Sequence, residues 1–425
     1  MTKPKLNTES KAWIAYDAGN SAFATTIVAA FFPIFYTEFW SSGVDSLVAT
    51  SYYTWTITIS NLVLLFSAPI IGSITDLSRT TKRLFTSFTM ISIFFVALLF
   101  TLELGDWFQA LIFFGIANYC FSAGNILYDK MLVQIAPQSQ LTRISSLGFA
   151  FGYLGGGMLF LVNAIMTLYP TSFGLADASE AIRWSFIMVS IWWSLFLIPI
   201  AIHFKDRGIA LYEKSLIKES TFKVFVTLRN ISEYKNAFLF LLAFFLYIDG
   251  VHTVMYLAST FAINIGLESS AVIIGLILVQ FVAFPATLIW SKISAKYGDR
   301  SVINICIIVY IAIVVYSTTL SSAAEFYILA AGVGSVQGGI QACSRSLFGK
   351  LVPEEKAGEF FGFFNTFGKA GAFIGPALVG MFIFVFDSIT IALTPIILLF
   401  VAGGLIILKV KEPNEITKQR INNFL

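Results

Sequence analysis

The chain has 425 residues, of which 57% are hydrophobic and only 12% are charged, and its mean hydropathy is +0.82. A water-soluble core of this length does not need so much apolar material, so the composition excludes an ordinary soluble protein and indicates a chain that crosses a membrane many times. The net charge of +3 comes without any interleaved aromatic and basic motif, and we therefore expect no nucleic-acid partner.

The first eleven residues are polar, and the apolar run after them is too long for the core of a signal peptide and lacks a clear cleavage site. We therefore expect this run to be retained as the first helix. Runs long enough to span a bilayer, at about 20 residues each, predict twelve transmembrane helices. In chain order they lie near 12–39, 48–72, 84–102, 108–130, 145–168, 184–203, 236–261, 270–293, 301–320, 324–347, 359–385 and 388–410.

The basic residues predict the orientation of these helices. In the twelve-helix model all of the 27 Lys and Arg residues except Arg183 and Lys369 fall on the side that holds both termini. Loops rich in Lys and Arg stay in the cytoplasm, so both termini are predicted to be cytoplasmic. A missed or extra helix would move basic loops to the opposite side of the membrane and remove this asymmetry. The asymmetry therefore also supports an even number of helices.

The longest predicted cytoplasmic connection, 204–235, contains seven Lys and Arg residues together with Phe222, Phe225 and Leu228. We expect it to lie partly as an amphipathic helix on the anionic inner leaflet. It divides the chain into an N-terminal six-helix bundle (1–203) and a C-terminal six-helix bundle (236–425).

The two predicted bundles resemble each other when they are slid by 216 residues. This shift places Pro137 on Pro353, Gly152 on Gly368, Gly155 on Gly371, Asp129 on Arg345 and Tyr153 on Lys369. Duplicated halves with a site between them are typical of secondary transporters that rock about a central cavity.

Seven segments carry a resemblance to a known family: YDAGNSAF at 16–23, APIIGSITDLSR at 68–79, GFAFGYLGGG at 148–157, FFLYIDGVHT at 244–253, QFVAFP at 280–285, GGIQACSRSLF at 338–348 and EFFGFFNTFGKAGAFIGP at 359–376. With them the chain resembles the major facilitator superfamily and, more narrowly, its vacuole effluxer-like branch, also called the unknown major facilitator family. The resemblance implies an all-α membrane fold of two pseudo-symmetric six-helix bundles. Eukaryotic members of the branch are associated with amino-acid efflux from the vacuole.

The chain departs from the family pattern on the cytoplasmic side. The superfamily loop motif is present after the second helix as Gly72 and Asp76, but Arg79 occupies the position of its second glycine. After the eighth helix the acidic position of the motif is lost, with Ala295 in its place. These departures suggest that the inner gate closes differently from the usual symmetrical charge lock.

Lys369 is the most informative residue, because a lone ammonium at membrane depth costs roughly 2.5–3.5 kcal/mol on insertion scales. It lies about ten residues into its helix from Glu359, or roughly 15 Å deep. Asp249 lies at a similar depth in the same bundle, and we expect the two to form a pair or near-pair facing the central cavity. The pair is either purely structural, or substrate and proton compete for its members. In the second case a substrate carboxylate on Lys369 frees Asp249 to take up a proton.

Other polar residues are candidates for lining the cavity. His252 and Tyr256 share a helix face with Asp249, and His252 either carries the coupling proton or is a buried neutral histidine bonded to a neighbour. The remaining candidates are uncharged and able to hydrogen-bond a polar solute: Asn20, Tyr153, Gln337, Gln341 and Asn365.

Charged residues on the cytoplasmic side are candidates for gating. Asp76, near Arg79, is placed to meet the positive end of the helix that begins at Glu359. Asp129 and Arg345 come from opposite bundles and have opposite signs at equivalent positions, which makes them a candidate gate pair across the two halves. Asp17, one turn inside the first helix, is a further gating or structural carboxylate. Solvated surface charges are the alternative for these residues.

These patterns predict a secondary active transporter that moves a small polar organic solute, an amino acid or related zwitterion or carboxylate, by alternating access. The coupling ion is predicted to be a proton or else Na⁺, in symport or antiport. No Walker motif, H-E-x-x-H, G-x-S-x-G or acidic metal cluster is present, so we expect neither an enzyme nor a cofactor or metal site. The alternatives are transport of a larger metabolite, such as a siderophore or peptide, and a transporter-like receptor without flux. We expect a monomer in a bacterial inner membrane.

Overall fold

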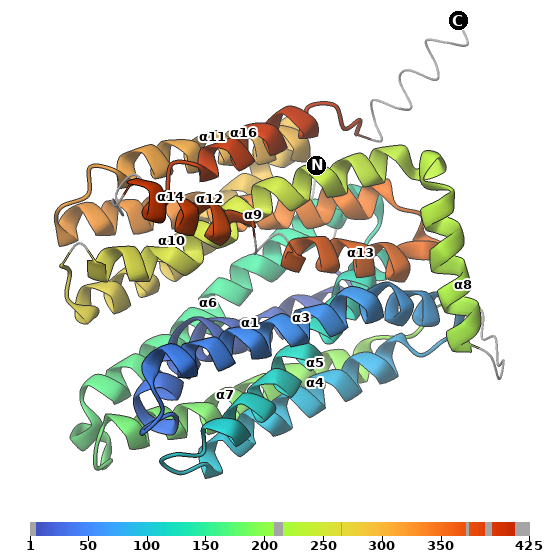
Figure 1. The fold of residues 1–425 in the computed structure, drawn as a ribbon. Helices are drawn as coiled ribbons and strands as arrows, with labels where there is room; N and C mark the ends of the chain where they lie inside the picture. The colour runs from blue at the N-terminus through green and yellow to red at the C-terminus, as the bar shows by residue number, and fades with distance from the viewer. Residues whose placement is uncertain (1–5, 208–215, 265, 371–373, 387–392, 413–425) are drawn as a thin grey trace, which may run out of the picture.

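The computed structural model describes residues 6–207, 216–264, 266–370, 374–386 and 393–412. Every regular element among them is helical, and most of the helices run roughly alongside one another (Figure 1). Nine of the described helices are long and apolar enough to cross a membrane. The all-helical membrane fold expected from the sequence is therefore present.

We call α1–α7 the N-terminal group of helices. It begins with one helical rod in which α1 (Thr8–Ala22) continues through a π-helical segment, η1 (Phe23–Phe31), into α2 (Phe32–Phe35) and η2 (Tyr36–Trp40). The other helices of this group are α3 (Ser46–Leu77), α4 (Thr81–Leu98), α5 (Trp107–Ile135), α6 (Leu141–Leu168) and α7 (Ala178–His203).

After α8 (Leu216–Arg229) comes what we call the C-terminal group. Its helices are α9 (Lys235–Asn264), α10 (Ser269–Tyr297), α11 (Asp299–Ser317), α12 (Ala323–Leu351), α13 (Ala357–Ala370), α14 (Ile374–Phe386) and α16 (Ile396–Ile407).

The first nine predicted spans coincide with the nine long apolar helices. The predicted span at 324–347 coincides with α12, and the span near 388–410 with the short helix α16. The span predicted at 359–385 covers α13, which ends at Ala370, and α14, which begins at Ile374, and residues 371–373 between them lie outside the described residues. The number of twelve spans remains a prediction.

Local signals in the sequence explain where several helices begin. The Asn7 side chain accepts a hydrogen bond from the Ser10 amide at 2.7 Å and so caps α1. Ser322 and Glu325 form a reciprocal capping box at the start of α12. Gly298 has φ +87°, a conformation that glycine adopts without strain, and this lets α10 pass directly into α11.

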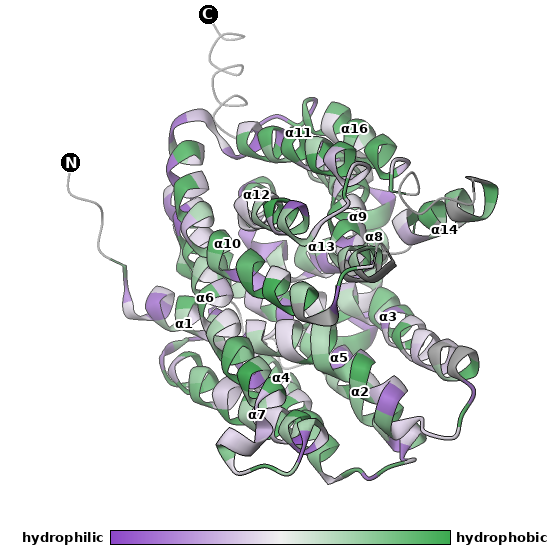
Figure 2. Cartoon of the chain, turned by 90° about the vertical axis from the view of Figure 1, so that its left-hand side faces the viewer, coloured by the Kyte–Doolittle hydropathy of each residue, from purple (hydrophilic) through white to green (hydrophobic). Residues whose placement is uncertain are grey.

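The buried apolar side chains form two clusters, one drawn from α1–α7 and one mainly from α9–α16. The two groups of helices meet where α6 packs on α10 and α12, and where α3 and α5 pack on α13. Hydrophobic residues dominate the outward faces in the end-on view of Figure 2. Many large apolar side chains, such as those of Phe66 and Ile202, are exposed. Such an outer surface suits a lipid environment.

Helix α8 runs across the other helices at one end of the molecule (Figure 1). We call this the linker end; it also carries the turn from α3 to α4 and the start of α13. Three of the predicted gating residues, Asp76, Arg79 and Glu359, lie there.

Candidate functional site

The turn after α3 meets the start of α13 at the linker end. The Asp76 carboxylate accepts hydrogen bonds from the amides of Gly358 and Glu359 at 2.9 and 2.8 Å. The Lys130 ammonium lies 2.9 Å from the same carboxylate, and both side chains are almost fully buried. We call Asp76, Lys130, Gly358 and Glu359 the Asp76 clasp. It places a carboxylate on the positive end of a helix, the contact that the sequence predicted for Asp76.

The helix backbones approach each other closely at this clasp. A Cβ atom added to Gly358 would collide with the backbone of Gly72, and a Cβ on Gly72 would collide with the carbonyl of Gly358. Only glycine at both positions allows α3 and α13 to cross at this distance. The glycine of the superfamily loop motif therefore has a packing role here.

Arg345 of α12 inserts into a buried pocket of the N-terminal group. Its guanidinium lies 3.3 Å from Asp129 and 3.7 Å from Asp17, and it donates to the Ser145 hydroxyl and carbonyl at 3.0 Å each. Asn365 of α13 donates to the second oxygen of Asp129 at 3.0 Å. Two carboxylates from α1 and α5 thus share one cation from the other group of helices.

Aromatic rings complete the surroundings of Arg345. The carbon at the centre of the guanidinium lies 4.1 Å from the ring centroid of Phe149, 4.7 Å from that of Trp13 and 5.5 Å from that of Tyr128. Trp13 and Tyr128 stack with their centroids 4.2 Å apart. A planar, weakly hydrated cation suits such a socket better than an ammonium does.

A second acidic contact between the two groups was missed by the sequence analysis. Asp299, the first residue of α11, is fully buried and accepts hydrogen bonds from the Thr142 hydroxyl of α6 at 3.0 and 3.1 Å. Lys350 lies 2.7 Å from the carboxylate and also donates to Thr142 at 2.8 Å. Ser294 donates to Asp299, and Ser346 bonds to Thr142. We call Asp299, Lys350, Thr142 and Ser346 the Asp299 clasp.

A signal for the Asp299 clasp is present in the sequence. Asp299 lies four residues after Ala295, where the motif was judged to have lost its acid, and Gly298 separates the two positions between α10 and α11. The shift of 216 residues that relates the two halves places Thr142 on Gly358. Each clasp therefore uses the same position near the start of equivalent helices, α6 and α13.

Lys369 lies near the end of α13 and is half-buried. Its ammonium is 5.8 Å from the centroid of Phe121, a residue of α5 in the other group of helices. His252 hydrogen-bonds to the backbone of Gly368 and lies close enough to Lys369 for the ammonium charge to act on the ring. Within the described part of the chain, no carboxylate lies within 4 Å of the ammonium.

Asp249 does not form the predicted pair with Lys369. Its carboxylate instead accepts a hydrogen bond from the Gly375 amide at 2.8 Å, at the start of α14. A backbone amide is a neutral donor that satisfies a buried carboxylate oxygen. Its other oxygen is buried and has no hydrogen-bond partner among the described residues.

The uncharged candidates are divided between the two groups of helices. The Tyr153 hydroxyl of α6 donates to Gln341 of α12 at 2.5 Å, so these two candidates meet across the groups. Asn20 accepts a bond from the Tyr16 hydroxyl at 3.3 Å, within the N-terminal group. Gln337 is buried.

The remaining candidates occupy less informative positions. Arg79 is exposed. The Glu359 side chain is buried beside the Asp76 clasp, and its backbone is part of that clasp. The side chain of Tyr256 lies outside the described residues.

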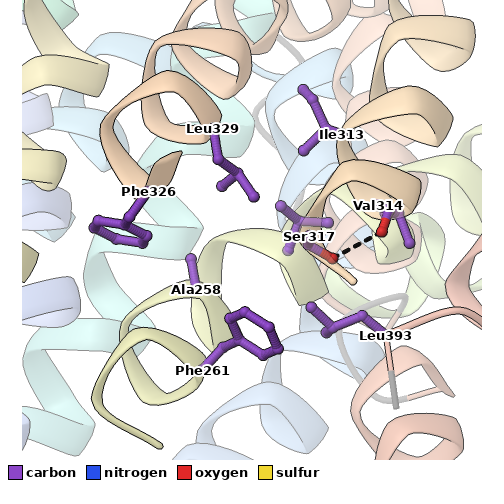
Figure 3. A pocket seen from close by; sticks show the side chains of 9 residues that line it. Ala258, Phe261, Ile313, Val314, Ser317, Phe326, Leu329 and Leu393 are labelled. Carbon is purple, nitrogen blue, oxygen red and sulfur yellow. Dashed lines mark hydrogen bonds between the residues drawn. The ribbon is translucent and has the colours of Figure 1, made fainter. Parts of the chain in front are cut away.

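A small hollow lies within the C-terminal group (Figure 3). Its lining is apolar except for Ser317, whose hydroxyl donates to the Val314 carbonyl at 2.7 Å. None of the predicted cavity residues lines it. This hollow therefore offers no charged or polar partner to a solute.

The chain is similar to known membrane transporters along its whole length. A family model described as "Vacuole effluxer Atg22 like" matches residues 6–420. YxiO of Bacillus subtilis (strain 168), an uncharacterized MFS-type transporter, is 33% identical over 423 residues, which cover 99% of each chain. Autophagy-related protein 22-1 of Penicillium rubens is 28% identical over 266 residues, which are 56% of this chain and 44% of the fungal protein.

Solved structures of the major facilitator superfamily (MFS) share the fold. The proton:xylose symporter XylE, bound to 6-bromo-6-deoxy-D-glucose, superposes with a TM-score of 0.72 at 12% identity, covering 95% of this chain and 96% of XylE. A bacterial homologue of the iron transporter ferroportin, in an outward-facing state, gives 0.68 at 12% identity and covers 95% and 99% of the two chains. At such low identity the likeness establishes the architecture alone. Through the family match and this architecture, the chain belongs to the vacuole effluxer Atg22-like family of MFS membrane transporters.

Proposed function

We propose that this transporter moves a small polar organic solute with a carboxylate, such as an amino acid or related zwitterion, by alternating access. The observation that carries the proposal is the Lys369 ammonium, half-buried between the two groups of helices with no carboxylate partner in the described structure. A cation held at membrane depth without a fixed anion is suited to bind the anionic group of a solute.

The asymmetry of charge supports a twelve-span topology with the linker end and both termini in the cytoplasm. The N-terminal bundle (1–203) and the C-terminal bundle (236–425) then act as the two moving units, consistent with their separate buried clusters. The two clasps and the Arg345 socket join these units at or near the linker end. In this proposal the structure is a state closed on the cytoplasmic side, and the protein works as a monomer in a bacterial inner membrane.

The proposed coupling ion is a proton, with Asp249 as its carrier. Within the described residues, one buried oxygen of this carboxylate has no hydrogen-bond partner, and the carboxylate is not paired with Lys369. Protonation gives that oxygen a neutral form that is less costly to bury. Na⁺ is the alternative, and a dependence of uptake on Na⁺ at constant pH would favour it.

The test begins with a thermal-shift screen of the purified protein against amino acids, peptides, organic acids and siderophores across pH. Each hit is then assayed for uptake into proteoliposomes. Lys369→Ala is expected to abolish the thermal shift and to lower uptake at least about 10-fold, since a charged hydrogen bond contributes about 1.5–3 kcal/mol. Asp249→Asn is expected to keep binding but lose the response of uptake to a pH gradient.

The matched control is Lys292→Ala, which removes an exposed lysine from α10. Hits that survive Lys369→Ala unchanged would overturn the assignment of the site. A ligand that stabilises the protein but is never accumulated in vesicles would favour a receptor. Hits confined to peptides or siderophores would favour the larger substrate class.

A further inference from the structure

Helix α8 has an exposed apolar face that none of the described helices covers. Ile217, Phe222, Phe225 and Leu228 are 69, 65, 63 and 45% exposed. Their spacing places them on one side of the helix. On the opposite side, Ser220 and Thr227 are buried. The helix therefore has one face bound to the protein and one face left for another partner.

Charge and orientation indicate what that partner is. Lys218 and Arg229, both exposed, lie on the same side of the helix as the apolar residues, and Lys223 is exposed elsewhere on the helix, with Glu219 as the only acid among the described residues 216–229. Figure 1 shows α8 running across the long helices at their end, and these helices are the candidate membrane spans, so α8 is oriented along the membrane plane. An exposed face that combines apolar side chains and cations in this orientation suits the headgroup region of an anionic leaflet.

The buried face of α8 contacts residues next to the Asp76 clasp, in α3 and just before α13. The Ser73 hydroxyl of α3 donates to the Ser220 carbonyl at 3.4 Å, three residues before Asp76. The Lys356 ammonium, just before α13, donates to the Thr227 hydroxyl at 3.1 Å and lies 4.9 Å from the ring centroid of Tyr234. One helix thus touches both sides of the junction that the clasp closes.

We propose that α8 docks on the anionic phospholipid surface of the inner leaflet and that this docking holds the Asp76 clasp closed. A helix anchored in the headgroup region keeps Ser220 and Thr227 in place, so that α3 and α13 remain joined through it. Anionic lipid then favours the state closed at the linker end, whatever solute is bound. The inference rests on the proposed placement of the linker end in the cytoplasm.

The test uses full-length protein without solute, in vesicles of phosphatidylcholine with or without phosphatidylglycerol. A fluorophore on Thr221→Cys reports docking through quenching by lipids that carry a spin label on the acyl chain. Spin labels on Arg83→Cys and Glu354→Cys report the distance between the two groups at the linker end. The native cysteines Cys120, Cys306 and Cys343 are buried, which favours labelling at the introduced sites.

In the wild-type background, phosphatidylglycerol is expected to increase quenching and to raise the ratio of closed to open protein about five-fold. A five-fold change in this ratio corresponds to the contribution of about one Lys or Arg near an anionic surface. The double variant Phe222→Ser/Phe225→Ser is expected to lose both responses. Thr227→Val is expected to keep the quenching response but lose the change in distance. The matched control Phe173→Ser, which removes a half-exposed phenylalanine outside α8, changes neither.

Quenching that is insensitive to phosphatidylglycerol would overturn docking, and would turn attention to a protein partner. Quenching that responds while the distance distribution of the wild-type background stays fixed would overturn the coupling to the clasp. Because neither readout uses a solute, these failures are distinct from a failure of the Lys369 site.

Discussion

The Asp76 clasp and the Asp299 clasp join the same two groups of helices in different ways. Asp76 follows the membrane-spanning part of α3 and accepts two backbone amides at the start of α13. Asp299 begins α11 and accepts the Thr142 hydroxyl near the start of α6. Gly358 and Thr142 are equivalent under the internal repeat, yet one contributes its backbone and the other its side chain. The acid of the second half therefore lies four positions later, at the start of the next helix, and still joins the two halves.

The partners of the two acids also differ in their access to water. The Lys130 side chain is 2% exposed, whereas that of Lys350 is 20% exposed. A cation that reaches water tolerates the loss of its partner better than one that is sealed in. The two clasps should therefore respond unequally to equivalent substitutions, and this inequality can be measured.

The largest effect is expected for Asp76→Ala. Lys130 would be left buried without its partner, and the start of α13 would lose its cap, at a cost of about 3–5 kcal/mol in the free energy of unfolding. Thermal or denaturant unfolding in detergent measures this cost. Glu355→Ala, at the exposed turn before α13, is the control. A loss below about 1 kcal/mol would show that the Asp76 clasp contributes little.

A smaller effect is expected for the equivalent change Asp299→Ala, about 1.5–3 kcal/mol, because Lys350 can turn toward water. The same unfolding measurement applies. If Asp299→Ala were as costly as Asp76→Ala, the difference in exposure between the two lysines would not govern the two clasps.

Gly358→Ala tests the close approach of the helices rather than the charges. Its methyl group would meet the backbone of Gly72, and overpacking of this kind costs about 1–3 kcal/mol. Most of the cost is expected to fall on the state closed at the linker end, which would be seen as longer distances between spin labels there. Gly332→Ala, where a Cβ would make only ordinary contact with Ile313, should leave the distances unchanged.

The smallest effect is expected for Glu412, which follows α16 and supports the start of α11. It accepts a hydrogen bond from the Arg300 amide at 2.8 Å, and burial raises the pKa of its carboxyl. Because its pKa is higher in the folded chain than in the unfolded chain, this carboxyl favours the folded state when it is protonated. The free energy of unfolding should therefore fall slightly as the pH rises from below the ordinary pKa of the carboxyl through its raised pKa. Glu412→Gln should flatten this part of the pH profile, and a profile identical to wild type would contradict the assignment.

Much of the architecture could be predicted from the sequence because apolar runs mark the segments that lipid can bury and basic loops mark the side of the membrane on which the loops are expected. The repeat was equally informative, since Asp129 and Arg345 were matched as opposite charges and lie 3.3 Å apart in the structure. Their gating role remains a prediction.

The pairing of Asp249 with Lys369 could not be judged from depth alone. Equal depth says nothing of the direction in which a side chain points, and Asp249 contacts the Gly375 amide instead of Lys369. Asp299 was missed because only the fixed motif position, Ala295, was compared, whereas the acid lies four residues later at the start of the next helix.

The aromatic socket around Arg345 has a spectroscopic consequence. Trp13 is fully buried, its indole N–H donates to the Tyr128 carbonyl at 2.8 Å, and a guanidinium lies near its ring. Separation of the two groups of helices would withdraw that cation and hydrate the indole, and both changes alter the emission of tryptophan. The native protein thus carries an optical reporter of its own opening, which needs no attached dye.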